Sequence, residues 1–362
     1  MMKILLVGGG TSGHVLPALS VGRAILKKDP QSELIFVGSL NGMDRDQVVA
    51  AGFKFVGVPA GKLRRYWDWQ NLADVFKIIS GFFVALSIIL RFWPDRVFIK
   101  GGYVGVPVGF AARLLGRSLI IHESDSHMGL ANRILLPFAK VAGVAFPVDS
   151  YKLSRLYNKR LIHTGIPLNE IFYDSTIPNN IGLVLPDNRP MLLVLGGSQG
   201  AHTVNQIIKT ALPQLLRDYT VVHLTGSHDF AELKAWAQNE RFRNYFLFES
   251  LPNEQVAYLM KKSVLIISRS GATTIAEIAA IGKPVILVPL PGSASEHQLH
   301  NAEYLSKHGA AVMIEQDNLS EDVLQELIFK ILNSDLGPRL VFNIKSMAQK
   351  EAGDQIADLI LQ

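Results

Sequence analysis

Two segments of this chain repeat one pattern, a short apolar run that ends in a cluster of glycines and continues into a helical stretch. The first is Ile4-Leu5-Leu6-Val7-Gly8-Gly9-Gly10-Thr11-Ser12-Gly13, and the second is Leu192-Leu193-Val194-Leu195-Gly196-Gly197-Ser198-Gln199-Gly200. Elsewhere, short β-like apolar runs alternate with helical stretches, which is the pattern of parallel sheets covered by helices. We therefore predict the α/β class, with two similar α/β domains that face one another.

The stretch from Thr164 to Arg189 separates the two halves of the chain. It is punctuated by Pro167, Pro178, Asn179, Asn180 and Pro186, a composition typical of a linker. A length of 362 residues also suits two domains. We predict an N-terminal domain over residues 1–164, a C-terminal domain over 165–340, and a helical segment over 341–362 that packs back on the N-terminal domain.

Composition and charge exclude several classes of function. The chain has no cysteine, which rules out disulfide scaffolds, cysteine zinc sites and thiol chemistry. Its net charge of +5 is spread out without a dense Lys/Arg tract, so a phosphate or an acidic lipid surface suits it and nucleic acid is not a predicted partner. The candidate motifs contain no carboxylate pair or His/Glu metal spacing, so we predict no metal and no cofactor.

Glycine-rich turns between a strand and a helix expose backbone N–H groups where the helix dipole favours a phosphate. A third turn of this kind, Gly101-Gly102-Tyr103-Val104-Gly105, follows the apolar run 96–99. One glycine cluster often only permits close packing or a positive φ, but three in one chain favour phosphate binding. The first turn lacks the strict spacing of a dinucleotide site, and the second apolar run has no acidic residue at its end, so a dehydrogenase is not favoured.

Two further segments carry candidate chemistry. His14 directly follows the first glycine cluster; a histidine there is often a cap or a surface residue, but it is also suited to general-base chemistry near neutral pH. Glu277 lies about one and a half turns into the helix predicted after Ser268, where it can accept hydrogen bonds from a ribose diol or simply interact with the helix dipole. The amide-rich segment 289–302 is suited to binding sugar hydroxyls.

Five motifs together resemble the MurG family, the bacterial UDP-N-acetylglucosamine (UDP-GlcNAc):lipid I N-acetylglucosaminyltransferases of peptidoglycan synthesis. They are GGGTSGHVLPAL, GGYVGVP with the following HES, LGGSQGAHTVN, RSGATTIAE and HQLHNA, in the family's order and spacing over nearly the whole chain. The resemblance implies the GT-B fold, with two Rossmann-like domains whose mainly parallel sheets face a central cleft. It also implies inverting transfer of GlcNAc from UDP-GlcNAc to the C4 hydroxyl of undecaprenyl-diphosphate-linked MurNAc-pentapeptide (lipid I), which forms lipid II.

The resemblance also assigns residues. His14 would be the catalytic base that deprotonates or orients the acceptor hydroxyl. The acceptor would be bound by Gly10, Gly13, Gly102 and Tyr103. The donor UDP-GlcNAc would be bound by Thr11, Ser12, Gly13, Asn132, Ser198, Gln199, Gly200, Arg269, Ser270, Gly271, Thr273, Glu277, Gln298 and Asn301.

Three segments depart from the family's pattern. The family's Asn-Pro-Val-Arg segment after the interdomain glycine reads Ile166-Pro167-Leu168-Asn169, so the expected arginine is missing and one donor contact is in doubt. The family's His-Glu-Gln-Asn reads His122-Glu123-Ser124-Asp125, and the second glycine of the first loop is Ser12. Acceptor binding is therefore expected to differ in detail.

The segment from Ile78 to Leu90 is uncharged and lies between basic residues, with Lys62, Arg64 and Arg65 before it and Arg91 and Arg96 after it. It is shorter than the roughly 20 apolar residues that a membrane-spanning helix needs. It is either a buried core helix or a surface contact in which Phe82, Phe83 and Trp93 enter the cytoplasmic leaflet. The second interpretation predicts a peripheral enzyme, a monomer or weak oligomer, at the cytoplasmic face of the plasma membrane through Ile78 to Trp93.

Three alternatives share the predicted architecture. One is a two-domain transferase with another lipid acceptor, such as diacylglycerol. Another is a catalytically silent protein that binds UDP-GlcNAc without turnover. The third is a hydrolysing epimerase, which would release UDP or an isomerised sugar without any acceptor.

Overall fold

The computed structural model describes residues 1–10, 12–40, 44–61, 69–174, 182, 185, 189–197, 200–240, 242–293 and 296–362. The chain forms two compact units: the first contains residues 1–169 and 349–362, and the second contains residues 170–348. The predicted divisions after residues 164 and 340 lie a few residues before these points.

The first unit is built on a sheet of seven parallel strands in the order β3-β2-β1-β4-β5-β6-β7. Apolar runs such as Ile4 to Val7 form its central strands because helices cover both faces and every side chain there is buried. The strands are β1 (Lys3–Val7), β2 (Glu33–Ser39), β3 (Lys54–Val58), β4 (Arg96–Ile99), β5 (Ser118–Glu123), β6 (Val141–Val144) and β7 (Leu161–His163).

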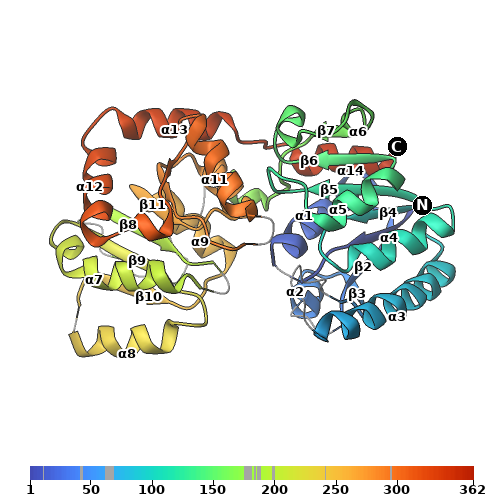
Figure 1. The fold of residues 1–362 in the computed structure, drawn as a ribbon, viewed down its shortest axis with the longest axis horizontal. Helices are drawn as coiled ribbons and strands as arrows, with labels where there is room; N and C mark the ends of the chain where they lie inside the picture. Colours follow the sequence, from blue (N-terminus) through green and yellow to red (C-terminus); the bar gives the residue numbers. More distant parts are fainter. Residues whose placement is uncertain are drawn as a thin grey trace. The chain divides into compact units, whose positions relative to one another are not determined.

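Helices cover both faces of this sheet (Figure 1). The α-helices are α1 (Ser12–Lys28), α2 (Asp44–Ala50), α3 (Trp69–Phe92), α4 (Gly105–Leu114), α5 (Leu130–Leu135), α6 (Arg155–Asn158) and α14 (Ala352–Leu361), with 3-10 turns η1 (Leu136–Phe138) and η2 (Val148–Tyr151). In α1 the apolar residues recur at helical spacing, so one face packs into the core.

The second unit repeats the plan with six parallel strands in the order β10-β9-β8-β11-β12-β13. These are β8 (Met191–Leu195), β9 (Thr220–Leu224), β10 (Tyr245–Phe248), β11 (Leu265–Ser268), β12 (Val285–Leu287) and β13 (Val312–Met313). The helices are α7 (His202–Asp218), α8 (Phe230–Glu240), α9 (Asn253–Lys262), α10 (Ala272–Ile281), α11 (His297–Lys307), α12 (Glu321–Leu332) and α13 (Leu336–Ser346), with 3-10 turns η3 (Glu170–Phe172) and η5 (Gln316–Asn318).

The last helix, α14, belongs to the first unit although it follows the second unit in sequence. Figure 1 shows it, in red, beside the elements of the first unit. Its buried residues Ile356, Ala357 and Ile360 join the core that α1 and β1 form. On the outside, Lys28 Nζ of α1 lies 2.8 Å from Asp358 Oδ1. The end of the chain thus packs back on the N-terminal unit.

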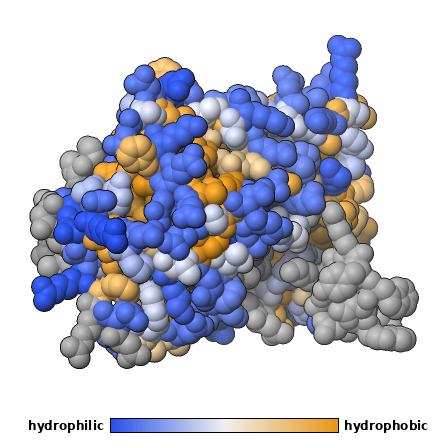
Figure 2. Space-filling model, turned by 60° about the vertical axis from the view of Figure 1, so that its left-hand side comes forward, coloured by the Kyte–Doolittle hydropathy of each residue, from blue (hydrophilic) through white to orange (hydrophobic). Residues whose placement is uncertain are grey.

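Each unit has its own hydrophobic core around its sheet. The core of the first includes Ile4, Leu6, Phe36, Phe98 and Ile120, and that of the second includes Leu192, Val194, Val221, Ile267 and Ile286. The face visible in Figure 2 is mostly hydrophilic, with apolar residues gathered in a smaller area near its middle.

Candidate active site

Several of the predicted site residues follow strands that lie where the strand order of each sheet reverses. In the first sheet β1 and β4 are neighbours, and in the second β8 and β11 are neighbours. The loops that leave the carboxyl ends of these neighbouring strands diverge. Open α/β sheets bind ligands in the crevice between such loops. The three glycine-rich turns follow β1, β4 and β8. The loop beginning at Arg269 follows β11.

In the first unit, His14 lies against the glycine turn that follows β4. His14 is the third residue of α1 and is half-buried. A Cβ atom placed on Gly101, whose φ is +111°, would lie 3.3 Å from Cδ2 and 3.4 Å from Nε2 of the His14 ring. A Cβ on Gly102 would lie 3.5 Å from Nδ1. The two loops therefore bring the imidazole close to the glycine turn, and a Cβ on Gly101 would crowd the ring.

The turn after β1 is closed by a buried carboxylate that the sequence did not reveal. Asp44, at the start of α2, accepts hydrogen bonds through Oδ2 from the amides of Gly10 at 3.2 Å and Ser39 at 3.0 Å. The Tyr103 ring lies over Gly10, where a Cβ would be 2.6 Å from Cε1. The amide of Gly10 is thus already engaged, and a diphosphate at this loop would rely on the amides that follow it. Thr11 lies outside the described residues.

Asn132 lies close to Gly101, as His14 does. Its Nδ2 is the third neighbour of the Cβ position on Gly101, at 3.5 Å. This amide donates to the carbonyl of His122 at 3.0 Å and to Glu123 Oε2 at 2.9 Å, so its orientation is determined by two acceptors. Among the described residues, the buried Oδ1 of Asn132 has no hydrogen-bond partner. A buried acceptor without a donor is a position that a substrate hydroxyl can satisfy.

Glu123 is a buried carboxyl that organises the loop after β5. It accepts hydrogen bonds from the amides of Asp125 at 3.0 Å and Gly129 at 2.8 Å as well as from Asn132. Burial raises its pKa and the nearby Asp125 adds to the rise, whereas the hydrogen bonds oppose it. These hydrogen bonds hold Asn132, at the start of α5, in one position.

Two further buried groups flank this network. Lys100, which follows β4, donates from Nζ to Ser124 Oγ, and burial lowers its pKa to about 8. His122 bonds through Nε2 to the carbonyl of Gly165 at 2.8 Å. Burial, followed by the charge of Lys100, holds the pKa of His122 well below its ordinary value, so this imidazole is neutral. The two residues that depart from the family pattern, Ser124 and Asp125, therefore both lie in this network.

In the second unit, the turn after β8 packs on the turn after β9. The Gly196 amide donates to Leu224 O at 2.8 Å, and a Cβ on Gly200 would lie 2.9 Å from Thr225 O. A Cβ on Gly226 would collide with the Gly200 backbone. Glycine at both positions permits this close approach. Ser198 and Gln199 lie outside the described residues.

The loops that follow β11 and β12 are joined by a buried polar network. Ser270 Oγ donates to Gln298 O at 2.7 Å, and Asn301 Nδ2 donates to Ser270 O at 3.2 Å. Gln298 Oε1 accepts from the amide of Leu290 at 3.1 Å. The structure thus brings together three of the residues predicted to bind the donor, at the adjacent starts of α10 and α11.

Arg269 also lies here, but its hydrogen bonds go to the protein. Nη1 donates to the carbonyls of Val288 and Pro289, each at 3.1 Å, and Nη2 donates to Gln316 Oε1 at 2.7 Å. Its side chain is buried, which lowers its pKa. In this structure the guanidinium ties together the loops around the site, and its contact with the donor stays a prediction.

Thr273 and Glu277 lie four residues apart on α10, so they share a face of the helix, and Gly271 precedes it as the N-cap. Both side chains are half-buried. Burial of its carboxyl group raises the pKa of Glu277 to about 8. At neutral pH Glu277 thus carries a proton for much of the time until a partner stabilises its charge.

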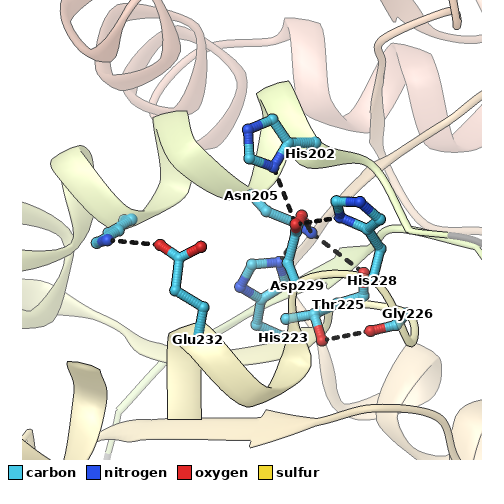
Figure 3. Close-up of polar contacts among 9 residues, drawn as sticks. His202, Asn205, His223, Thr225, Gly226, His228, Asp229 and Glu232 are labelled. Atoms are coloured by element: carbon cyan, nitrogen blue, oxygen red, sulfur yellow. Dashed lines mark hydrogen bonds and ion pairs between the residues drawn. The ribbon is translucent and has the colours of Figure 1, made fainter. Parts of the chain in front are cut away.

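A cluster that sequence reasoning missed lies beside the turn after β8 (Figure 3). His202 Nδ1 and His228 Nδ1 lie 2.9 and 2.7 Å from Asp229 Oδ1. Burial alone would raise the pKa of Asp229, but hydrogen bonds from His228, His202 and Asn205 lower it to about 2. The adjacent His228 and Asp229 were the available signal, but their distance from His202 in sequence concealed the cluster.

Helix α3, which contains most of the uncharged segment, has one buried and one exposed face. Ala85, Ile89 and Phe92 are buried. The side chains of Phe76, Ile79, Phe83, Leu90 and the following Trp93 are between 49% and 65% exposed. The four on the helix are separated by three, four and seven residues, so they form a single stripe. No helix in the described ranges has both the length and the apolar character to cross a bilayer.

Comparison with protein families agrees with this two-unit plan. Residues 4–144 match the glycosyltransferase family 28 N-terminal domain, and residues 191–360 match the glycosyltransferase family 28 C-terminal domain.

Curated relatives cover nearly the whole chain. A Clostridium novyi protein named UDP-N-acetylglucosamine--N-acetylmuramyl-(pentapeptide) pyrophosphoryl-undecaprenol N-acetylglucosamine transferase is 34% identical over 361 residues, 99% of this chain and 98% of the relative. Proteins with the same name from Clostridium botulinum (strain Langeland) and Treponema denticola are 36% and 35% identical. They cover 90% and 97% of this chain, and the matches span 90% and 93% of the relatives.

Solved structures share the fold. Acinetobacter baumannii MurG is 26% identical, with a TM-score of 0.77 and coverage of 100% of this chain and 99% of that one. A UDP-GlcNAc 2-epimerase from Neisseria meningitidis has a TM-score of 0.69 at 15% identity and covers 99% and 100% of the two chains, which shows the fold alone. The predicted α/β class of GT-B type, with two Rossmann-like units and parallel sheets, is confirmed.

Proposed function

This chain belongs to the MurG family of glycosyltransferase family 28, and we propose that it transfers GlcNAc from UDP-GlcNAc to lipid I with formation of lipid II. It is a glycosyltransferase, as its motifs predicted, and relatives over 90% or more of its length are named for this transfer. In this proposal the first unit binds the acceptor and the second unit binds the donor.

The position of His14 is the observation that supports its assignment as the catalytic base. Its imidazole lies at the reversal point of the first sheet, packed against Gly101 and Gly102. Asn132 was predicted to bind the donor, but its side chain also lies close to Gly101, and its buried Oδ1 lacks a hydrogen-bond donor among the described residues. A sugar hydroxyl placed between them can donate one hydrogen bond to Asn132 or give its proton to His14.

The proposed step inverts the anomeric carbon. The C4 hydroxyl oxygen of the acceptor forms a bond to C1 of GlcNAc on the face opposite UDP, while the C1–O bond to the β-phosphate breaks and UDP leaves with the electron pair. The hydroxyl proton passes to a ring nitrogen of His14. Amides of the glycine turn after β8 stabilise the charge that develops on UDP.

On the donor side, the second unit supplies the predicted residues from three loops. Gly200 and the neighbouring Ser198 and Gln199 face the diphosphate in this proposal, and Glu277 accepts hydrogen bonds from the ribose. Gln298 and Asn301 lie beside Ser270 in one network, which favours a common role around the GlcNAc hydroxyls.

The departures at Ser124 and Asn169 bear on substrate detail. Ser124 accepts a hydrogen bond from the buried Lys100. Its hydroxyl is therefore directed into the protein network, whereas the family's glutamine would offer a side-chain amide to the substrate. Asn169 ends the first unit's main segment. We infer that the contact made by the family's arginine is absent or is supplied by another residue.

We also propose that the stripe on α3 contacts the cytoplasmic face of the plasma membrane, where the lipid-linked acceptor lies. Phe83 and Trp93, two of the three predicted contacts, are well exposed, while Phe82 is half-buried. Phe76 and Leu90 extend the stripe. A stripe of exposed aromatic and aliphatic side chains is suited to the interfacial region of a bilayer.

Basic residues adjoin this stripe. Arg117 lies over the Trp93 ring, with Cζ 4.3 Å from the ring centroid. Arg117 also lines a surface pocket together with Arg113, Lys140 and Arg160. Such a cluster attracts anionic headgroups, which supports peripheral attachment. The predicted basic residues Lys62, Arg64 and Arg65 lie outside the described residues.

Mass spectrometry of a short-chain lipid I analogue after incubation with UDP-GlcNAc tests the reaction. The proposal expects the analogue to gain one N-acetylhexosamine with release of UDP. UDP or an isomerised sugar released equally without acceptor would instead indicate an epimerase, and donor binding with no product would indicate a silent binding protein. Gain of the sugar on diacylglycerol but not on the analogue would indicate another lipid acceptor.

A further inference from the structure

Three potential metal ligands converge beside the turn after β8, although they come from separate segments. His202 is the first residue of α7, and His228 and Asp229 lie in the loop between β9 and α8. Their three ligand atoms, the two imidazole Nδ1 atoms and a carboxylate oxygen, all lie within 4.8 Å of one another. Figure 3 shows the two rings directed at the same carboxylate from different elements.

The chemistry of these atoms selects a class of metal ion. Two imidazole nitrogens and one carboxylate oxygen suit divalent first-row transition ions such as Zn²⁺, whereas Mg²⁺ and Ca²⁺ prefer oxygen ligands alone. With Zn–N and Zn–O bonds of about 2.0–2.1 Å, tetrahedral ligands lie about 3.3 Å apart. The two Nδ1 atoms lie 2.9 and 2.7 Å from Asp229 Oδ1, so the donors need to separate by about half an ångström to admit the ion.

The two histidine side chains can make that adjustment, whereas Asp229 is held in place. The side chains of His202 and His228 are 60% and 74% exposed, so the rings can move. Asp229 is 2% exposed and its second oxygen, Oδ2, accepts from Asn205 Nδ2 at 2.7 Å. One ligand is thus held in place and two can close on an ion.

A chain of buried polar groups supports the fixed ligand. Asn205 Oδ1 lies 2.9 Å from His223 Nε2, and His223 Nδ1 lies 2.9 Å from the hydroxyl oxygen of Tyr245. Asn205 Nδ2 also donates to Thr225 O at 3.1 Å. Metal ligands are commonly oriented by such outer hydrogen bonds, and here they direct the free lone pairs of Asp229 Oδ1 toward the two imidazoles.

We propose that His202 Nδ1, His228 Nδ1 and Asp229 Oδ1 form a binding site for a divalent transition-metal ion, with Zn²⁺ the best match. The ion joins the first turn of α7 to the loop before α8. These are the elements that pack around Gly200, where a Cβ would lie 3.7 Å from His228 Cβ. Its role is to fasten these two loops, and the remaining coordination position faces solvent. The site takes no part in the glycosyl transfer chemistry and stands whether or not the proposed acceptor is correct.

Zinc binding to the full chain tests the proposal directly. Protein freed of metal with a chelator is titrated with Zn²⁺ by calorimetry, and Co²⁺ is added separately to record the absorption of a coordinated ion. The matched variants are His202→Gln and His228→Gln, which leave Asp229 and its buried partners intact. His308→Gln is the control because that side chain is exposed and bonds only to its own helix through Tyr304 O.

The proposal expects one tight equivalent of Zn²⁺ in the wild type and in His308→Gln. Each cluster variant should lose more affinity than the roughly 10- to 100-fold that removal of an outer-shell partner produces. Zn²⁺ should raise the Tm of the wild type but not of the cluster variants, because only bound metal stabilises the native state. Absence of a tight equivalent in the wild type, or its survival in both cluster variants, would overturn the site.

Discussion

The His14 imidazole occupies the space next to Gly101: a Cβ on Gly101 would meet Cδ2 of the ring at 3.3 Å and Nε2 at 3.4 Å. Gly101→Ala should therefore displace the ring as well as strain the backbone, since φ there is +111°. We expect destabilisation of about 1–3 kcal/mol and a fall in kcat, measured by urea unfolding and by steady-state transfer assays.

Gly116→Ala provides the matched control for that prediction. Gly116 also has a positive φ, +66°, but nothing lies within 4 Å of its Cβ position. Gly116→Ala should therefore be less stable, but the folded variant should keep the kcat of the wild type. Equal kcat losses in the two variants would show that the contact with His14 does not matter.

Asn132→Ala should reduce both stability and turnover. It removes hydrogen bonds to His122 O and Glu123 Oε2, and leaving buried acceptors short of a donor costs about 1–3 kcal/mol. Asn343→Ala is the control, because Asn343 Nδ2 likewise donates to a carbonyl, that of Gly309, at 3.0 Å. If Asn132 binds the acceptor, Asn132→Ala should lose activity at saturating UDP-GlcNAc, whereas Asn343→Ala should keep it. Unchanged turnover in Asn132→Ala would remove it from the site.

Glu277 gives a pH dependence with a definite sign. Its pKa is raised from 4.5 toward about 8, so between these values the folded state holds a proton that the unfolded state has lost. The free energy of unfolding contributed by this group therefore falls as pH rises through that window. Glu277→Gln should show a smaller loss of stability between pH 5 and pH 8, measured by denaturant unfolding at each pH. Identical pH profiles for the two proteins would contradict the assigned shift.

The stripe on α3 should govern attachment to vesicles. Replacing Phe76 and Phe83 with Ser should reduce sedimentation with vesicles that contain anionic phospholipid, because it removes apolar surface from the interface. The control replaces Phe329 and Phe342 of the second unit, which are 68% and 77% exposed. Salt should weaken binding through screening of the basic residues. Equal sedimentation of all three proteins would leave α3 without a membrane role.

The sheets were predictable because parallel strands buried on both faces read as continuous apolar runs. The apolar run 96–99 coincides with β4, and the run from Leu192 to Leu195 lies within β8. Strand β7 was missed, since only Leu161 of its three residues is buried and no apolar run marks it. Strand order could not be inferred from the sequence, because it depends on contacts between distant segments.

Side-chain partners within the site were less predictable than the positions of the loops. The sequence placed His14, Gly102 and Tyr103 at glycine-rich turns between strands and helices, but nothing in it indicated that Asp44 would accept a hydrogen bond from the amide of Gly10. Arg269 follows a strand as expected, yet its hydrogen bonds tie adjacent loops together. Such pairings depend on loop geometry, for which a sequence has no periodic signal.

The most direct test of the central claim compares wild type with His14→Ala in the mass-spectrometric transfer assay, with His163→Ala as control for an exposed histidine of the same unit. UDP-GlcNAc affinity, measured by calorimetry, reports whether the second unit remains intact. The account predicts that His14→Ala keeps donor affinity but loses about 10²- to 10⁴-fold in kcat, the usual contribution of a general base. Transfer by His14→Ala at the wild-type rate would contradict it.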